Sequence, residues 1–390
     1  MRVPSKKNAA TGGKTAANQF KVAPAATSSL KLESVEAFPV RLKIGEKLRA
    51  GTFAYSHYQT VVVRVEVDGV EGWGEAMTRF DPDATAIMVR YLAKGMVGTE
   101  FEEVSQPWAR AWRELRIRGH TRGTDVEALS GIEMALYDAV GHILGAPLGA
   151  LFTRRPRRRV PAFAGSLFAS RGRLEDQVDE AMSQGLAGAK VKIGFGVRDD
   201  LRTLEAVRRR WPDGMLVGDA NGAYDAGGAA KACEAFTDLD LAWFEEPVLS
   251  DDLDGYARLR KTGVRIGAGE SWYVGDFRTP VEHGLVGVVE PSVSRCGGVG
   301  VQIDVARRAA RKGIEFSPMV GLNSILSLAA SIHAASVCPS VGVEYDPYPN
   351  PLQRDLGQGV TRPSKGTIEV PRGPGLGVTV DRSFLKAHSR

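Results

Sequence analysis

The sequence predicts an α/β protein in which a β/α barrel follows a small α+β unit. The first observation is a repeat: from about residue 159, short apolar strands alternate with amphipathic helices, which implies parallel strands. Seven such strands after an opening strand near 159–164 fit a barrel. The predicted strand ends recur every 22 to 27 residues, at Lys192, Asp219, Glu245, Glu270, Ser292, Met319 and Glu344. A doubly wound open sheet is the alternative, but no Gly-x-Gly-x-x-Gly turn follows a first strand.

The part of the chain before the repeat shows two other patterns. Within 31–77, apolar and polar residues alternate as in half-buried strands, and Asp68-Gly69 is a turn dipeptide, so antiparallel strands are expected. Residues 125–145 carry one apolar stripe at helical spacing, and Gly145 is placed to end that helix. The first 29 residues lack apolar periodicity and are predicted to be a disordered extension without the apolar core of a secretory signal.

Composition excludes several classes of function. The 390 residues are 43% hydrophobic and 25% charged, as in a soluble globular protein, and no apolar run is long enough to span a membrane. Residues 1–32 hold six basic residues and no acid, so the net charge of +5 falls to −1 without them. A nucleic-acid partner is therefore not expected. The arginine-rich run 154–159 is interpreted as a solvated connector. Three cysteines without disulfide or zinc spacing favour a cytoplasmic location.

Three successive predicted strands end in acids: Asp219, Glu245 and Glu270. Side chains at these strand ends converge on one mouth of a barrel, where three carboxylates repel each other unless a cation lies between them. Ligands that are all oxygen favour Mg²⁺ or Mn²⁺. Side-chain alternation lets only one residue of the pair Glu245-Glu246 face the axis, and Asn221 is placed to support Asp219. The alternative is that each acid caps the following helix.

Two lysines lie on the strand before the first acid. Lys190 and Lys192 are two residues apart, so both face the barrel interior. We expect the two ammonium groups and a nearby metal to lower their pKa values, which would make one lysine a general base. The alternative is two lysines that extend to the rim of the barrel.

Together these motifs resemble a known family. Lys-x-Lys, Asp-x-Asn, Glu-Glu-Pro and Gly-Glu-Ser occur in this order, with GWGEA at 72–76 and SRCGGV at 294–299. The set resembles the enolase superfamily, in its mandelate racemase and muconate lactonizing branch, over about 31–385. The resemblance implies a modified TIM barrel, (β/α)7β, with an N-terminal α+β capping domain. The implied parts are the capping domain 30–155, completed by about 350–390, and the barrel 156–349.

The resemblance also implies a site. One Mg²⁺ per protomer would be bound by the three acids, and Lys192 would remove the proton α to a carboxylate and form an enediolate intermediate. Lys190 would tune this base, and Glu344 would orient the substrate. Specificity would reside in a cap loop at about 45–60, with Arg49, Tyr55, His57 and Tyr58 as candidate contacts. Expected partners are a small-molecule carboxylate and further copies of the chain, as a dimer or octamer.

One part of the family pattern is absent. The His-Asp dyad expected across the substrate is replaced by Ser292 and Met319, which we include among the candidate substrate-binding residues, with Asn221. A proton donor for a leaving group could then be Lys192 itself or a metal-bound water. Other candidates are Tyr224, Tyr273, Glu290 and His57.

The predicted function is dehydration of an acid sugar, an aldonate or aldarate, to a 2-keto-3-deoxy acid. One alternative is an isomerase with the same scaffold, either an epimerase or a cycloisomerase. A second alternative is a metal-binding homologue without catalytic activity, which the missing dyad motivates.

Overall fold

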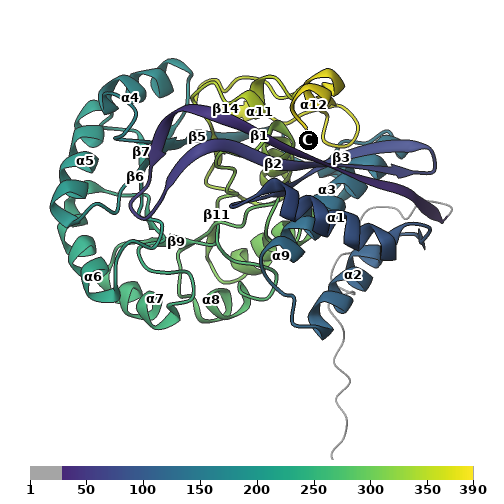
Figure 1. Cartoon of the computed structure of the whole chain (residues 1–390). Coiled ribbons are helices and arrows are strands. Elements are labelled where there is room, and N and C mark those ends of the chain that lie inside the picture. Colours follow the sequence, from purple (N-terminus) through teal and green to yellow (C-terminus); the bar gives the residue numbers. More distant parts are fainter. Residues whose placement is uncertain (1–28, 390) are drawn as a thin grey trace, which may run out of the picture.

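A computed structural model describes residues 29–389, so nearly all of the predicted disordered extension, 1–29, lies outside the described residues. Figure 1 shows two parts: a ring of parallel strands and helices, and a unit of long strands and helices packed beside it. No helix within 29–389 is both long and apolar enough to cross a membrane.

The unit beside the barrel contains an antiparallel sheet with the strand order β3-β2-β1-β4, as predicted. Its strands are β1 (Leu30–Arg49), β2 (Ala54–Val67), β3 (Val70–Met77) and β4 (Glu100–Phe101). Asp68 and Gly69 both have positive φ, 46° and 75°, which is the backbone of a type I′ turn between β2 and β3. The β1–β2 hairpin extends from this unit across the barrel (Figure 1).

Three helices cover the antiparallel sheet: α1 (Pro82–Met96), α2 (Ser105–Ile117) and α3 (Thr124–Ile143). The predicted helix 125–145 corresponds to α3, and Gly145 beyond its end has a positive φ of 60°. β3 packs so closely on α3 that a Cβ added at Gly74 would lie 2.6 Å from the backbone nitrogen of Ala135. Glycine is therefore required at this contact.

Eight parallel strands form the barrel, in the order β11-β10-β9-β8-β7-β6-β5-β12. They are β5 (Arg159–Leu167), β6 (Gly188–Lys192), β7 (Met215–Asp219), β8 (Trp243–Glu245), β9 (Ile266–Ala268), β10 (Val288–Val289), β11 (Glu315–Phe316) and β12 (Val343–Tyr345). The backbone amide of Val341, just before β12, donates to the carbonyl of Phe316 at 2.9 Å and joins the two ends. The predicted barrel is confirmed.

Three predicted strand ends need correction. Glu270, Ser292 and Met319 lie two or three residues beyond β9, β10 and β11 rather than at their ends. Ser292 and Met319 still form an isolated parallel bridge, so the two segments run side by side without a continuous ladder.

One helix follows each of the first seven barrel strands, which gives the (β/α)7β order, and these helices form the outer layer in Figure 1. They are α4 (Leu174–Ser183), α5 (Val197–Arg210), α6 (Ala226–Ala235), α7 (Leu253–Leu259), α8 (Arg278–His283), α9 (Val299–Ala310) and α10 (Ile325–Val337). Short 3₁₀ helices are η2 (Leu148–Leu151), η3 (Thr237–Leu239) and η4 (Arg260–Thr262).

The last segment contacts both parts of the molecule. It contains α11 (Pro351–Arg354), β13 (Gly357–Gln358), β14 (Thr367–Glu369), β15 (Thr379–Val380) and α12 (Arg382–His388). β14 pairs with barrel strand β5, whereas α12 packs on β1 of the cap. These contacts agree with a segment that completes the cap, and the domain boundaries 30–155, 156–349 and 350–390 remain predictions.

Buried acids of the cap fasten it to the barrel. The Glu75 carboxylate on β3 accepts hydrogen bonds from the backbone amides of Ser324 and Ser327 at the start of α10, at 2.9 and 3.1 Å. Glu133 on α3 accepts from the amide of Val299 at 2.7 Å. Because both acids meet the N-termini of barrel helices, the cap and its hairpin are held over one end of the barrel.

The arginine-rich run 154–159 lies at the connection into β5. Arg157 donates to the carbonyl of Cys338 at 3.0 Å, and Arg159 forms an ion pair with Glu369 at 2.9 Å. Part of the run therefore fastens the connector to neighbouring segments, whereas the side chains of Arg154, Arg155 and Arg158 are exposed as predicted.

Candidate active site

The three predicted acids meet at one end of the barrel. Asp219 ends β7, Glu245 ends β8, and Glu270 follows β9 by two residues. All three are buried, and each offers one carboxylate oxygen within 4.8 Å of the others. They do not cap helices, because the side chains that cap α6 and α7 are those of Asp225 and Asp252.

The neighbouring Glu246 belongs to a different environment, as the alternation of side chains predicts. Its backbone has a positive φ of 37°, and its carboxylate accepts from the amide of Ser271 at 3.3 Å. Burial, and then the charge of Glu270, raises the pKa of Glu246 to about 8. Glu246 is therefore a buried support of the loop after β9 rather than a member of the acid cluster.

The two lysines of β6 face the acid cluster. The Lys190 ammonium lies 2.9 Å from Glu245 Oε1 and 3.4 Å from Asp219 Oδ2. Lys192 is bonded to Asp219 and donates to Asn221 Oδ1 at 3.1 Å. Both lysines are buried, so the alternative in which they extend to the rim is wrong.

Asn221 connects Lys192 to the acids. Its side-chain amide donates to Glu270 Oε1 at 3.0 Å while its oxygen accepts from Lys192, and its backbone amide donates to Asp219 Oδ1 at 3.0 Å. Its positive φ of 46° lets the short loop after β7 turn both groups inward. Asn221 therefore has the supporting position that the sequence predicts.

The predicted lowering of the lysine pKa values is wrong for the charges present in this structure. Burial alone would lower the pKa of Lys190, but the charges of Glu245 and Glu344 raise it well above its ordinary value. For Lys192, burial and the neighbouring ammonium also lower the pKa, and Asp219 outweighs them. The mutual repulsion of two lysines is real but smaller than their attraction to the acids.

The acid cluster fits a divalent metal ion. Burial, followed by the charge of Asp219, raises the pKa of Glu245 well above its ordinary value, which shows that the carboxylates are costly to keep charged together. A set of three carboxylates without cysteine or histidine is the donor set that Mg²⁺ prefers. Asp219, Glu245 and Glu270 would hold the ion.

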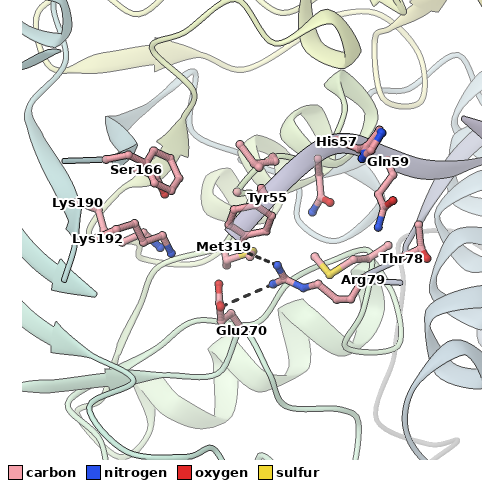
Figure 2. Close-up of a pocket in the computed structure, with 15 residues that line it drawn as sticks. Tyr55, His57, Gln59, Thr78, Arg79, Ser166, Lys190, Lys192, Glu270 and Met319 are labelled. Atoms are coloured by element: carbon pink, nitrogen blue, oxygen red, sulfur yellow. Dashed lines mark hydrogen bonds and ion pairs between the residues drawn. The ribbon is translucent and has the colours of Figure 1, made fainter. Parts of the chain in front are cut away.

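A cavity lies between the acid cluster and the cap. Figure 2 shows Tyr55, His57 and Gln59 of β2 facing Lys190 and Lys192 of the barrel across this space. The side chains that line the cavity are those of Tyr55, His57, Gln59, Met77, Thr78, Arg79, Ser166, Phe168, Lys190, Lys192, Glu270, Met319, Leu322 and Asn323. The hairpin reaches the barrel, since Thr52 donates to the carbonyl of Asn221 at 3.3 Å.

Several predicted contact residues do not line this cavity. The side chain of Arg49 is exposed, and its backbone amide donates to Ser170 Oγ at 2.9 Å. Tyr58 is buried. Ser292 is also buried, with its hydroxyl 3.4 Å from that of Ser294. Alternation along β2 explains why Tyr55 and His57 face the cavity while Tyr58 does not.

Glu344 has a supporting place instead of a position on the cavity wall. One carboxylate oxygen pairs with Lys190, and the other accepts from the backbone amides of Val320 and Gly321 at 3.0 and 2.7 Å. Glu344 therefore joins β6 to the loop before α10 that carries Met319.

The candidate proton donors differ in whether they lie at the cavity. The hydroxyl of Tyr224 is bonded to Asp200, and that of Tyr273 donates to Glu127 at 3.1 Å. Arg295 also pairs with Glu127, at 3.1 Å. Glu290 is buried away from the cavity wall. Besides Lys192, His57 is the candidate donor whose side chain lines the cavity.

Sequence reasoning missed Arg79. This residue follows β3 by two positions, and its guanidinium lies 3.7 Å from Glu270 Oε1, as the dashed line in Figure 2 shows. It also donates to the hydroxyl of Tyr55 at 2.9 Å. An arginine just after a predicted strand of the cap was the available signal, whereas the family pattern indicates contacts only in the loop at about 45–60.

A capped (β/α)7β barrel with three buried carboxylates and two lysines at its mouth defines a class of metal-dependent barrel enzymes. Residues 173–384 match the family described as "Enolase C-terminal domain-like", and residues 38–152 match "Mandelate racemase / muconate lactonizing enzyme, N-terminal domain". The chain belongs to the enolase superfamily, in its mandelate racemase and muconate lactonizing branch. The predicted resemblance is thereby confirmed.

Relatives of known name cover nearly the whole chain. A D-galactarolactone cycloisomerase of Agrobacterium fabrum is 29% identical over 374 residues, which are 91% of this chain and 98% of the relative. An arabinonate dehydratase of Saccharolobus solfataricus is 27% identical over 331 residues, 83% of this chain and 88% of the relative. The crystal structure of a racemase from Streptomyces coelicolor with bound magnesium superposes with a TM-score of 0.84 at 27% identity, covering 92% of this chain and 100% of that one.

Proposed function

We propose that this enzyme uses Mg²⁺ to remove the proton α to the carboxylate of an acid sugar, and that the reaction is the dehydration of an aldonate or aldarate to a 2-keto-3-deoxy acid. The observation that supports this most strongly is Lys192, whose side chain lines the cavity beside three buried carboxylates. The arabinonate dehydratase among the relatives supports the acid-sugar class.

Each residue of the site has a separate role in this proposal. Lys192 would accept the α-proton as a neutral amine, which requires that a metal ion held by Asp219 weaken the attraction that keeps this lysine protonated, and Asn221 fixes the position of its nitrogen. Lys190 places a positive charge beside the substrate carboxylate, held by Glu344 from behind. When bound by Asp219, Glu245 and Glu270, Mg²⁺ would stabilise the negative charge that develops on the substrate carboxylate.

Dehydration also needs a proton for the departing hydroxyl. His57 lies on the cap side of the cavity, across from the lysines (Figure 2), and Ser56 Oγ lies 2.9 Å from its Nδ1. We propose His57 as the donor in an elimination across opposite faces of the substrate. Lys192, returning the proton that it removed, would serve a syn elimination.

A cycloisomerase is the second candidate. It is favoured by the D-galactarolactone cycloisomerase that matches 91% of the chain, and by a site in which one lysine base has no His-Asp dyad opposite. A cycloisomerase needs one base and one donor, whereas a racemase needs a base on each face of the substrate. The homo-oligomeric state and the cytoplasmic location remain predictions.

Product analysis tests the proposed function. The protein is incubated with Mg²⁺ and a set of aldonates, aldarates and their lactones, and products are identified by mass and NMR. Loss of one water supports dehydration, whereas a product of unchanged mass supports the cycloisomerase. A protein that binds Mg²⁺ but converts none of these acids would instead support the homologue without catalytic activity.

A further inference from the structure

A second cavity, lined by arginines, lies at the opposite end of the barrel from the acid cluster. Its volume is about 460 Å³, and its wall comes mainly from the connector into β5 and the segment after β14. Arg158 directly precedes β5, whereas Ser166 near the end of that strand lines the cavity of the proposed active site. At about 3.3 Å per residue, the strand separates the two cavities by about 25 Å. A ligand here would not touch a substrate at the acid cluster.

This second cavity carries a concentrated positive charge. No aspartate or glutamate lines it, and its five arginines are Arg154, Arg155, Arg157, Arg158 and Arg372. The sequence accounts for the imbalance, because no acidic residue occurs in 139–174 or in 370–380, the two stretches that supply these arginines. The histidine of the lining, His333, adds no charge, since its Nδ1 accepts a hydrogen bond from the amide of Gly149 at 3.3 Å.

Most of these guanidinium groups have no partner. Within the described part of the chain, the side chains of four of the five, all except that of Arg157, form no ion pair or hydrogen bond. By contrast, the arginine run 208–210 on α5 has acids beside it, and Arg210 pairs with Asp179 at 2.5 Å. Because a guanidinium has five N–H donors, the cavity offers many donors to a bound anion.

Hydrogen bonds of the main chain hold the connector in place. The backbone amide of Arg157 donates to the carbonyl of Ser336 in α10 at 3.0 Å, and the amide of Val370 donates to the carbonyl of Arg158 at 3.0 Å. The side chain of Arg157 also donates to the carbonyl of Cys338 at 3.0 Å. The unpaired arginines therefore extend from a fixed backbone, which lowers the entropy cost of binding a ligand.

We propose that this cavity is an anion site that binds a small molecule with two or more phosphate groups. The planar guanidinium forms paired hydrogen bonds with phosphate oxygens, and several negative charges on one molecule match several unpaired arginines. The volume is in the range of small-molecule sites. No Phe, Tyr or Trp lines the cavity to stack on the bases of a nucleic-acid strand. The site goes beyond the proposed function and does not depend on it.

Calorimetric titration with pyrophosphate tests this site. The free Mg²⁺ concentration is held fixed, because pyrophosphate complexes this ion. We expect saturable binding that weakens with added salt and is about tenfold or more tighter than that of inorganic phosphate. In Arg154→Gln/Arg155→Gln, the affinity should fall about tenfold or more for each arginine removed. Arg372→Gln, in the other segment of the wall, should weaken binding about tenfold on its own.

Tripolyphosphate and ATP distinguish the sources of the phosphate groups. Equal binding of the two supports a site that recognises the phosphates alone, whereas tighter binding of ATP supports a nucleotide as the ligand. In both cases the affinity should fall in Arg154→Gln/Arg155→Gln.

The matched control is Arg113→Gln/Arg116→Gln, which removes two charges from exposed positions on cap helix α2 and should bind pyrophosphate like the wild type. Lys192→Ala should also keep this binding. Loss of binding in Lys192→Ala would place the anion in the proposed active site and overturn the second site. Thermal melting confirms that each variant is folded.

Two further results would overturn the proposal. One is the absence of saturable pyrophosphate binding to the wild type, or an affinity that is unchanged in both Arg154→Gln/Arg155→Gln and Arg372→Gln. The other is displacement of pyrophosphate by oligonucleotides whose affinity rises with their length, which would indicate a nucleic-acid surface instead of a small-molecule site.

Discussion

In the cluster at the barrel mouth, Asp219 and Glu245 are each stabilised by a lysine and destabilised by the neighbouring acids. Asp219 is an example. Burial raises its pKa, but the charges of Lys192 and Lys190 lower it by more, so the pKa of Asp219 is below its ordinary value. Glu245 lies deeper among the other acids, and its pKa is raised. A divalent ion would relieve this repulsion, so the ion should stabilise the folded protein.

Asp219→Asn tests that expectation. Mg²⁺ should raise the melting temperature of the wild type, since a ligand at 100 times its Kd adds about 2.7 kcal/mol of stability. The variant loses one charged ligand, so most of this shift should disappear. Asp225→Asn, at the N-cap of α6 and outside the cluster, is the matched control and should keep the shift. An undiminished Mg²⁺ shift in Asp219→Asn would refute the assigned ligand.

A buried histidine predicts how stability changes with pH. His333 accepts from the amide of Gly149 through Nδ1 and lies 3.3 Å from the Leu376 carbonyl through Nε2, so the ring is neutral. Burial lowers its pKa to about 4. Because the unfolded state takes up a proton near pH 6.5 and the folded state does not, this histidine costs stability as pH falls from about 6.5 to 4.

The variant His333→Gln has no imidazole at this position, so its unfolded state does not take up the proton. Urea unfolding between pH 4 and 7 should show a wild-type curve steeper than that of the variant by up to about 1.4 kcal/mol per pH unit, rising with pH. If the unfolding free energies of the two proteins change in parallel with pH, then His333 has the same pKa in the folded and unfolded states, which contradicts this prediction.

At the scale of single elements, strand β3 contacts two neighbouring helices, α3 and α10. Gly72 and Gly74 face α3 and allow the helix backbone to approach. Glu75, on the same strand, accepts a hydrogen bond at the start of α10. The motif GWGEA is thus a packing motif as much as a marker of the family.

Gly74→Ala should destabilise the cap. Its Cβ would lie 2.6 Å from the amide nitrogen of Ala135 and closer still to the carbonyl of Gly131, both backbone atoms that cannot rotate away. Overpacking of this kind costs about 1–3 kcal/mol. Gly45→Ala is the control, since no atom lies within 4 Å of its added Cβ and the cost should be small. Equal unfolding free energies for the two variants would contradict the packing argument.

The regular elements were the most predictable from sequence. The strands that carry Lys192, Asp219 and Glu245 follow from apolar runs spaced by one helix each, and local patterns suffice for them. β9, β10 and β11 end earlier than predicted because the chain leaves the ladder before Glu270, Ser292 and Met319, and no local signal marks that point.

The cap side of the site was less predictable. Tyr55 and His57 were identified, but Arg49 lies outside the cavity and Arg79 was missed. Which side of the hairpin faces the barrel, and which loop lies beside it, depends on how the two parts dock. The prediction of lowered lysine pKa values failed because it counted the repulsion between the two ammonium groups but not the attraction of the acids, which is led by Glu245 for Lys190 and by Asp219 for Lys192.

At the scale of the whole molecule, the proposed active site lies where the cap meets the barrel. The barrel supplies the acids and lysines, and the cap supplies Tyr55, His57 and Arg79. Contacts that set the relative position of the two parts should therefore affect catalysis without touching a substrate.

Glu75→Gln tests this coupling. The change weakens a buried acceptor for the amides of Ser324 and Ser327, at a cost of about 1.5–3 kcal/mol for a charged hydrogen bond. We expect faster hydrogen exchange at the start of α10 and a lower kcat/KM. Glu71→Gln on the same strand breaks only partly exposed ion pairs with Arg64 and Arg382 and should leave both properties near wild type. Identical behaviour of the two variants would argue against the coupling.

The central claim is that Lys192 removes the proton α to the substrate carboxylate. The most direct measurement follows that proton by NMR in D₂O with Mg²⁺ and the acid sugars, comparing the wild type with Lys192→Ala and with Arg116→Gln as control. We predict loss of the α-proton signal, by exchange or by product formation, in the wild type and the control but not in Lys192→Ala. An α-proton lost equally fast in Lys192→Ala, in protein shown to be folded and to bind Mg²⁺, would contradict the account.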